Sequence, residues 1–293
     1  MSKTIIPHPT DMVSKTGDTI ARHGRDESLH PHTQIESLTS QGPVGLDYYL
    51  FIPGGSDIPE AVMVSVHGLA RNAAENMFRF ARLAEEHNVC LIVPHFSREL
   101  HRRFQTLAPG KQGASADDAL NEVLMDVDKR FGMDTEQVTM FGYSGGGQFV
   151  HRYILCNPGR VERAVLMAPG WFTMPDANAP YPYGLANSEE LHAHQISFKS
   201  LLGTPILVMV GDADKRRNSS LNRDRRIDLV QGRTRLARAK AWVQAMNNAA
   251  RAHQVPENVS LHVIEGAGHS FTRNMGEHKL GELTMDFLFS NQQ

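Results

Sequence analysis

The chain has 293 residues, of which 41% are hydrophobic and 21% are charged, and its formal net charge at pH 7 is −2. This composition is typical of a globular protein and excludes a disordered chain. A net charge so close to zero argues against nucleic acid or an anionic membrane surface as a partner. No segment approaches the roughly 20 apolar residues that a membrane span requires.

The N-terminal part of the chain is polar. Residues 1–40 show no clear periodicity, so we predict an N-terminal extension followed by one domain over residues 41–293. The first residues, MSKTIIPHPTDMVSKTGD, lack the apolar core of a secretory signal, which predicts a cytoplasmic protein. The two cysteines, Cys90 and Cys156, fall in apolar segments typical of a buried strand and a helix, and no disulfide framework is expected.

From Leu46 onward, short β-rich runs alternate with amphipathic helical patterns. The predicted strands are Leu46–Ile52, Ala61–Val66, Val89–Val93, Gln137–Phe141, Arg163–Met167, Pro205–Val210 and Val259–Ile264. The predicted helices lie near Ala74–His87, Ala116–Phe131, Gly145–Cys156, Thr234–His253 and His278–Phe289. The middle and later strands are nearly continuous apolar runs, as expected where helices cover both faces of a sheet. The predicted fold class is therefore α/β, with a doubly wound, mostly parallel sheet.

Residues 171–203 interrupt this alternation, and we predict that they form a short lid insertion. The segment is rich in prolines and aromatic residues, namely Trp171, Phe172, Pro175, Pro180, Tyr181, Pro182 and Tyr183. Trp171 and Phe172 follow closely after a predicted strand. They either line an apolar substrate pocket or pack the lid.

The strongest single motif is Phe141-Gly142-Tyr143-Ser144-Gly145-Gly146-Gly147, which follows an apolar strand and opens a helix. A serine at such a sharp turn takes strained backbone angles, and the flanking glycines remove the Cβ atoms that would clash there. Ser144 is therefore the predicted nucleophile, with the helix dipole and the Gly145 N–H available to a developing oxyanion. The alternative is a glycine-rich helix start of a nucleotide-binding fold.

A serine hydroxyl needs a neutral imidazole to accept its proton and a carboxylate to orient that imidazole. Of 15 histidines, only His269 follows the last predicted strand on a glycine-containing loop, in the sequence Glu-Gly-Ala-Gly-His-Ser-Phe. We predict that His269 is the general base, the alternative being a surface histidine.

Two carboxylates follow the strand that ends at Val210 and compete for the orienting role. Asp214 lies further beyond the strand end, where it can reach the His269 loop, so it is the predicted acid. Asp212 is well placed to cap its own turn. Asp176 in the insertion is a further alternative, because some enzymes of this architecture take the acid from an earlier loop.

The strand over Val62–Val66 runs into the turn His67-Gly68-Leu69-Ala70-Arg71-Asn72. Such a turn usually supplies the second N–H of an oxyanion hole, and we assign this N–H to Leu69, or to Ala70 if the turn is shifted by one residue. We expect His67 to hold the loop by hydrogen bonding.

Together, the HG, GYSGG, GDAD and GAGHS motifs make the chain resemble the α/β-hydrolase superfamily over roughly residues 45 to 290. The stretches HGLARNA, VPHFSREL and GYSGGGQFVHRY are similar to esterases related to polyhydroxybutyrate depolymerases. The resemblance implies a serine hydrolase of a small or medium carboxylic ester, acting through an acyl-enzyme. An amide, carbamate, thioester or carbon–carbon bond, acyl transfer, and non-catalytic ligand binding are the alternatives.

The remaining signals predict no further ligand. Residues 215–240 are rich in arginine and lysine, but interleaved aspartates favour a solvated face over nucleic-acid binding. Arg216 or Arg217 could meet an anionic substrate group. The histidine pairs His192/His194 and His30/His32 lack a supporting ligand cluster, so we expect no metal. We also expect no cofactor. The expected partner is a small ester-like substrate, and a homo-oligomer is left open.

Overall fold

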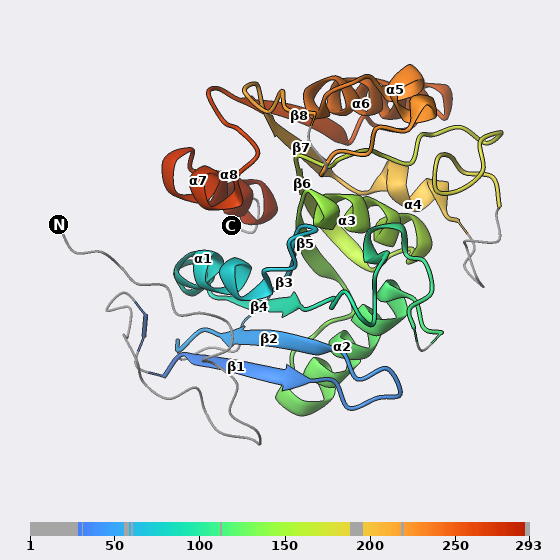
Figure 1. Cartoon of the computed structure of the whole chain (residues 1–293). Coiled ribbons are helices and arrows are strands. Elements are labelled where there is room, and N and C mark those ends of the chain that lie inside the picture. The colour runs from blue at the N-terminus through green and yellow to red at the C-terminus, as the bar shows by residue number, and fades with distance from the viewer. Residues whose placement is uncertain are drawn as a thin grey trace.

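In the computed structural model, residues 29–30, 32–55, 59, 61–111, 113–187, 196–217 and 220–290 are described. They form an eight-stranded sheet with the order β1-β2-β4-β3-β5-β6-β7-β8 (Figure 1). The strands are β1 (Gln34–Thr39), β2 (Asp47–Ile52), β3 (Ala61–Val66), β4 (Val89–Pro94), β5 (Val138–Tyr143), β6 (Val161–Met167), β7 (Ile206–Gly211) and β8 (Val259–Ile264). β1 and β2 pair antiparallel, as do β2 and β4, and all other neighbours are parallel. The prediction of a mostly parallel α/β sheet is confirmed.

Strand β1 corrects the predicted N-terminal extension. Residues 34–39 were expected outside the main domain, yet they pair with β2 in unbroken register from Gln34 opposite Ile52 to Thr39 opposite Asp47. None of the six β1 side chains is buried, so this edge strand lacks the apolar alternation that reveals a strand in a sequence. Residues 1–28 of the expected extension lie outside the described residues.

Helices cover both faces of the sheet (Figure 1). They are α1 (Ala73–Glu86), α2 (Ala116–Phe131), α3 (Gly145–Cys156), α4 (Phe198–Gly203), α5 (Arg225–Gln231), α6 (Arg235–Ala252), α7 (Phe271–Glu277) and α8 (Leu280–Phe289), with a 3-10 turn η2 at Phe104–Thr106. Val62, Val64 and Val66 of β3 pack in one core cluster with α2, α3 and α6, whereas Met63 packs in a second cluster with α1 and α8. The period of two along a strand therefore separates two cores, one on each face.

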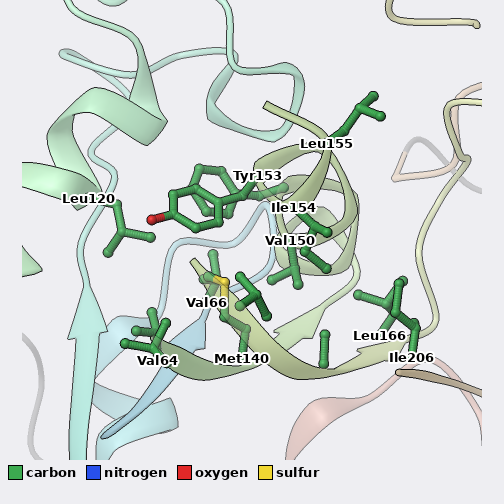
Figure 2. Packing of buried hydrophobic residues seen from close by; sticks show 14 of the residues in the cluster. Val64, Val66, Leu120, Met140, Val150, Tyr153, Ile154, Leu155, Leu166 and Ile206 are labelled. Atoms are coloured by element: carbon green, nitrogen blue, oxygen red, sulfur yellow. The ribbon is translucent and has the colours of Figure 1, made fainter. Parts of the chain in front are cut away.

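Helix α3 is the most deeply enclosed helix of the described residues, since all twelve of its side chains or Cα positions are buried. Figure 2 shows Val150 and Ile154 of α3 packed over Met140 and Leu166 of the sheet. This packing fixes the N-terminus of α3 against the end of β5. The turn that contains Ser144 therefore begins a helix whose position the core determines.

The predicted lid insertion is described over residues 171–187 and 196–203. Its first part folds back on itself through backbone hydrogen bonds such as Met174 N–H to the Tyr183 carbonyl, at 2.9 Å. The hydroxyl of Tyr181 donates to the Thr106 carbonyl at 2.9 Å and ties the insertion to the η2 segment. Its role as a lid stays a prediction. None of the described helices combines the length and apolar character that crossing a membrane requires.

Ile154→Ala tests the part that the α3 core plays in stability. Ile154 is 1% exposed, so its truncation leaves a cavity, and we expect the free energy of unfolding in urea to fall by about 2–5 kcal/mol. The control is Met125→Ala on α2, where the side chain is 62% exposed and the expected change is within about 0.5 kcal/mol. Equal effects for the two variants would contradict this account of the core.

Candidate active site

The β5–α3 turn holds Ser144 in a strained conformation, with φ of 53° and ψ of −104°. Such backbone angles are unfavourable for a residue other than glycine and persist only where surrounding structure imposes them. A Cβ atom added to Gly146 would lie 2.1 Å from the Val66 carbonyl oxygen, so only glycine permits this approach to β3. The Ser144 N–H donates to the Met167 carbonyl at 2.7 Å, which anchors the turn to β6 as well.

Three side chains from distant loops meet at the carboxyl edge of the sheet. Nε2 of His269 lies 3.1 Å from Oγ of Ser144, and Nδ1 of His269 lies 2.8 Å from Oδ2 of Asp214. The carboxylate accepts the Nδ1 proton, which leaves Nε2 as the acceptor for the serine hydroxyl. The Asp214 side chain is 1% exposed and that of His269 is 16% exposed, so the relay is largely shielded from solvent.

The two other candidate acids have different partners. Oδ1 of Asp212 accepts a hydrogen bond from the Gly266 N–H at 2.9 Å, so Asp212 fastens the His269 loop instead of only capping its own turn. Oδ1 of Asp176 accepts from the Asn178 N–H at 2.9 Å within the insertion. Of the three candidates, Asp214 is the one that contacts the imidazole.

A buried cation that the sequence analysis missed stands behind Asp214. The Arg235 guanidinium donates to Oδ1 of Asp214 at 3.0 Å, and both side chains are 1% exposed. Arg235 is the first residue of α6, where a positive side chain opposes the helix dipole. Among the many basic residues of 215–240, the sequence carries no local signal that marks Arg235.

Tyr143 is a second residue whose contact with the site was not predicted. Its ring stacks on His269 with 5.1 Å between ring centroids and 25° between planes. Burial raises the pKa of Tyr143 above its usual value, so the phenol stays neutral at pH 7. The flat ring limits how the imidazole can tilt away from Ser144.

The Leu69 amide nitrogen lies close to Gly145, the residue that follows Ser144. A Cβ atom added to Gly145 would have the Leu69 amide nitrogen as its nearest backbone neighbour, at 3.2 Å. The Gly145 N–H belongs to the first turn of α3, where helix N–H groups have no partner within the helix. The assignment of Leu69, or of Ala70, and of Gly145 as oxyanion donors stays a prediction.

His67 is structural in its contacts. It is fully buried, its Nδ1 donates to the Gly68 carbonyl at 2.9 Å, and its Nε2 accepts from the Phe96 N–H at 3.1 Å. Burial lowers the pKa of His67 to about 3, so the ring is neutral at pH 7. Arg71 reinforces the same attachment by donating to the carbonyls of Phe96 and Arg102. The turn that carries Leu69 is thereby fixed to the loop after β4.

The two predicted substrate-binding aromatics differ. Phe172 is fully buried and stacks on Trp242 with 4.7 Å between ring centroids, so it packs in the core and offers no surface to a substrate. Trp171 is 6% exposed and lies between Tyr183 and the guanidinium of Arg152, whose central carbon is 4.2 Å from the ring centroid. The prediction is corrected for Phe172 and stays a prediction for Trp171.

The basic segment is only partly a solvated face. Arg235 and Arg238 are buried, and Arg238 donates to Oδ1 of Asp228 at 2.8 Å. Arg217, considered above as an anion-binding residue, already donates to both oxygens of Asp228. The arginines therefore hold this part of the chain together through ion pairs.

The sequence analysis considered two histidine pairs as possible metal ligands and predicted that neither forms a metal site. Within the described part of the chain, no group of three or more His, Cys, Asp or Glu side chains is arranged to hold a metal ion. His192 and His194 lie outside the described residues. Nδ1 of His30 accepts the His32 N–H at 3.3 Å.

Comparisons with known proteins place this geometry in a fold family. No family model and no curated protein matches the sequence. Among solved structures, the chain is similar to poly(aspartic acid) hydrolase-1 from Sphingomonas sp. KT-1, at 24% identity and a TM-score of 0.72, over 87% of this chain and 99% of that chain. It is also similar to a poly(3-hydroxybutyrate) depolymerase from Bordetella parapertussis, at 23% identity and a TM-score of 0.73, over 90% and 92%.

The chain has the α/β-hydrolase fold. A third similar structure, an S-formylglutathione hydrolase from Agrobacterium tumefaciens, has 17% identity and a TM-score of 0.58 over 87% of this chain and 95% of that chain. The resemblance expected from the HG, GYSGG, GDAD and GAGHS motifs is thus confirmed at the level of the fold.

The neutral, buried imidazole of His67 predicts sensitivity to acid. Its pKa is about 3 in the folded chain and 6.5 is the ordinary value, so the unfolded chain binds more protons between these two pH values. The free energy of unfolding should therefore fall as pH drops from about 6.5 toward 3, with up to about 1.4 kcal/mol per pH unit from this group.

His67→Gln removes this titration, so the loss of stability on acidification should be shallower in the variant, as measured by urea unfolding at several pH values. His262→Gln is the matched control, because His262 is exposed on β8 and the variant should keep the wild-type slope. An unchanged slope in His67→Gln would show that His67 does not contribute to the acid sensitivity.

Proposed function

We propose that this chain is a serine hydrolase that cleaves a small or medium carboxylic ester through an acyl-enzyme intermediate. The observation that carries the proposal is the continuous contact from the Ser144 hydroxyl to His269 at 3.1 Å and on to Asp214 at 2.8 Å. A nucleophile, a base and an orienting carboxylate in this order are the parts that acyl transfer requires. An intact relay also argues against a purely ligand-binding role.

In the proposed reaction, the Ser144 oxygen attacks the ester carbonyl carbon while Nε2 of His269 takes the hydroxyl proton. The N–H groups of Leu69 and Gly145 donate to the oxyanion that forms. His269 then gives its proton to the alkoxide leaving group, which departs and leaves the acyl group on Ser144. Water, deprotonated by His269, attacks the acyl carbon, and His269 returns this proton to the Ser144 oxygen as the acid leaves. Asp214 stabilises the imidazolium in both halves of the reaction.

The names of structurally similar proteins support the choice of an ester bond. A ferulic acid esterase is among the similar structures, at 15% identity and a TM-score of 0.57, and its name is that of an ester hydrolase. The relay itself serves several carbonyl substrates, so the bond type is the part of the proposal that needs a direct assay.

A panel of p-nitrophenyl esters, anilides and carbamates tests the reaction, together with labelling by a fluorophosphonate probe. Ser144→Ala should lower kcat by about 10⁶-fold and abolish labelling, since the nucleophile is lost. Ser260→Ala, at an exposed position of β8, is the matched control and should label like the wild type. Labelling of Ser144→Ala, or a kcat within about tenfold of the wild-type value, would refute the assignment of the nucleophile.

A comparison of two aspartates tests the acid. Asp214→Asn retains the shape of the side chain but loses the charge that fixes the imidazole tautomer, and kcat should fall by about 10⁴-fold. Asp212→Asn affects the contact with Gly266 and should cost far less, because the carboxylate does not touch His269. The reverse ranking of the two kcat values would assign the acid to Asp212.

A further inference from the structure

We propose that Arg235 is a positioning residue of the relay, which fixes the Asp214 carboxylate in orientation so that His269 presents Nε2 to Ser144. The proposal rests on the proposed hydrolase function, and it adds a fourth side chain to the three that the motifs identify.

The geometry gives each Asp214 oxygen a separate partner. Oδ2 accepts from Nδ1 of His269 at 2.8 Å, and Oδ1 accepts from the Arg235 guanidinium at 3.0 Å. With both oxygens engaged, the carboxylate cannot rotate about its Cβ–Cγ bond without losing a charged hydrogen bond. The direction in which Oδ2 faces the imidazole is therefore set from behind by Arg235.

The burial of the Asp214 carboxylate also calls for a positively charged partner, and Arg235 is that partner. A carboxylate that is 1% exposed is costly to keep ionised, and a neutral carboxyl group would stabilise the imidazolium poorly. Arg235 is permanently positive and equally buried, so it offsets this cost. In the described part of the chain, three further groups interact electrostatically with the pair or with its neighbour. Tyr143 of β5 is kept neutral by burial, Glu75 of α1 acts on Tyr143, and the positive charge of Arg238 on α6 is repelled by that of Arg235.

Arg235 is itself held in place. Its second terminal nitrogen donates to Oγ of Ser220 at 2.9 Å, and the side chain of Thr234 caps α6 by accepting from the Ala237 N–H at 3.2 Å. The start of α6 thus acts as a fixed support for the guanidinium. Because both its backbone and its guanidinium are held, the Arg235 side chain fixes the position of Asp214 relative to α6.

Arg238 shows what a purely structural arginine looks like in this chain. It lies one turn further along α6, is fully buried, pairs with Asp228 at 2.8 Å, and donates to the carbonyls of Gly170 and Asn222. It makes none of the contacts of the relay. Loss of either arginine removes a buried ion pair, but only loss of Arg235 changes the charge beside Asp214 and His269.

Two variants at position 235 separate charge from contact. Arg235→Gln retains hydrogen-bonding ability but removes a positive charge beside the Asp214–His269 pair, so the pair binds a proton more tightly. In a plot of the labelling rate constant against pH, the acidic limb should therefore move up by about one pH unit. The plateau rate should fall by up to about 10²-fold with little change in KM, because the imidazole is misplaced. Arg235→Lys restores the charge and should return the limb to the wild-type pH.

The measurement is the second-order rate constant of fluorophosphonate labelling from pH 5 to 9, with kcat and KM for a p-nitrophenyl ester and circular dichroism to establish folding. Arg238→Met is the matched control: it should lower the melting temperature and leave the acidic limb at the wild-type pH. If Arg235→Gln keeps the wild-type limb and the wild-type labelling rate per folded molecule, the proposal is overturned.

If Arg235→Gln does not fold, Arg235→Lys decides. One ammonium group cannot hold Asp214 and Ser220 in the fork geometry of a guanidinium, so labelling should slow several-fold, and a wild-type rate would overturn the proposal. Failure of the proposed function is distinguishable in the wild type alone. A wild-type chain that labels at Ser144 but hydrolyses none of the panel contradicts the ester assignment only, whereas one that does not label at any pH overturns both proposals.

Discussion

Ser144 lies in a turn so tight that the Gly146 Cα faces the Val66 carbonyl, and β3, β5, β6 and α3 must all hold their places for that turn to exist. The buried side chains of α3 provide the necessary support, because the helix cannot withdraw from the sheet without exposing both strand and helix. The packing of α3 thus offsets the backbone strain at Ser144, and the Ser144 hydroxyl is held by a main chain that cannot relax.

The relay was predictable from the sequence because each of its members belongs to a short pattern with a local physical reason. Ser144 follows an apolar strand and precedes glycines, His269 sits between a strand and a helix, and Asp214 follows a buried strand. Strands β5, β7 and β8 are parallel, so their carboxyl ends share one edge of the sheet. Local patterns and a simple topological rule were sufficient to bring the three together.

Features that depend on partners far along the chain were not predictable. Arg235 was one of many basic residues, and nothing local distinguishes it from Arg225, which is exposed at the start of α5. Of the adjacent aromatics Trp171 and Phe172, the sequence could not tell which one turns into the core. Strand β1 is held by backbone pairing at the sheet edge, and its side chains carry little trace of that role.

The loops that carry Asp214 and His269 are joined directly. Asp212 accepts from the Gly266 N–H at 2.9 Å, and the Ala213 N–H donates to the Ala267 carbonyl at 3.1 Å. Asp214 and His269 are consequently held together by contacts that involve no atom of Ser144. Replacement of Ser144 would therefore leave the imidazole–carboxylate pair assembled at the edge of the sheet.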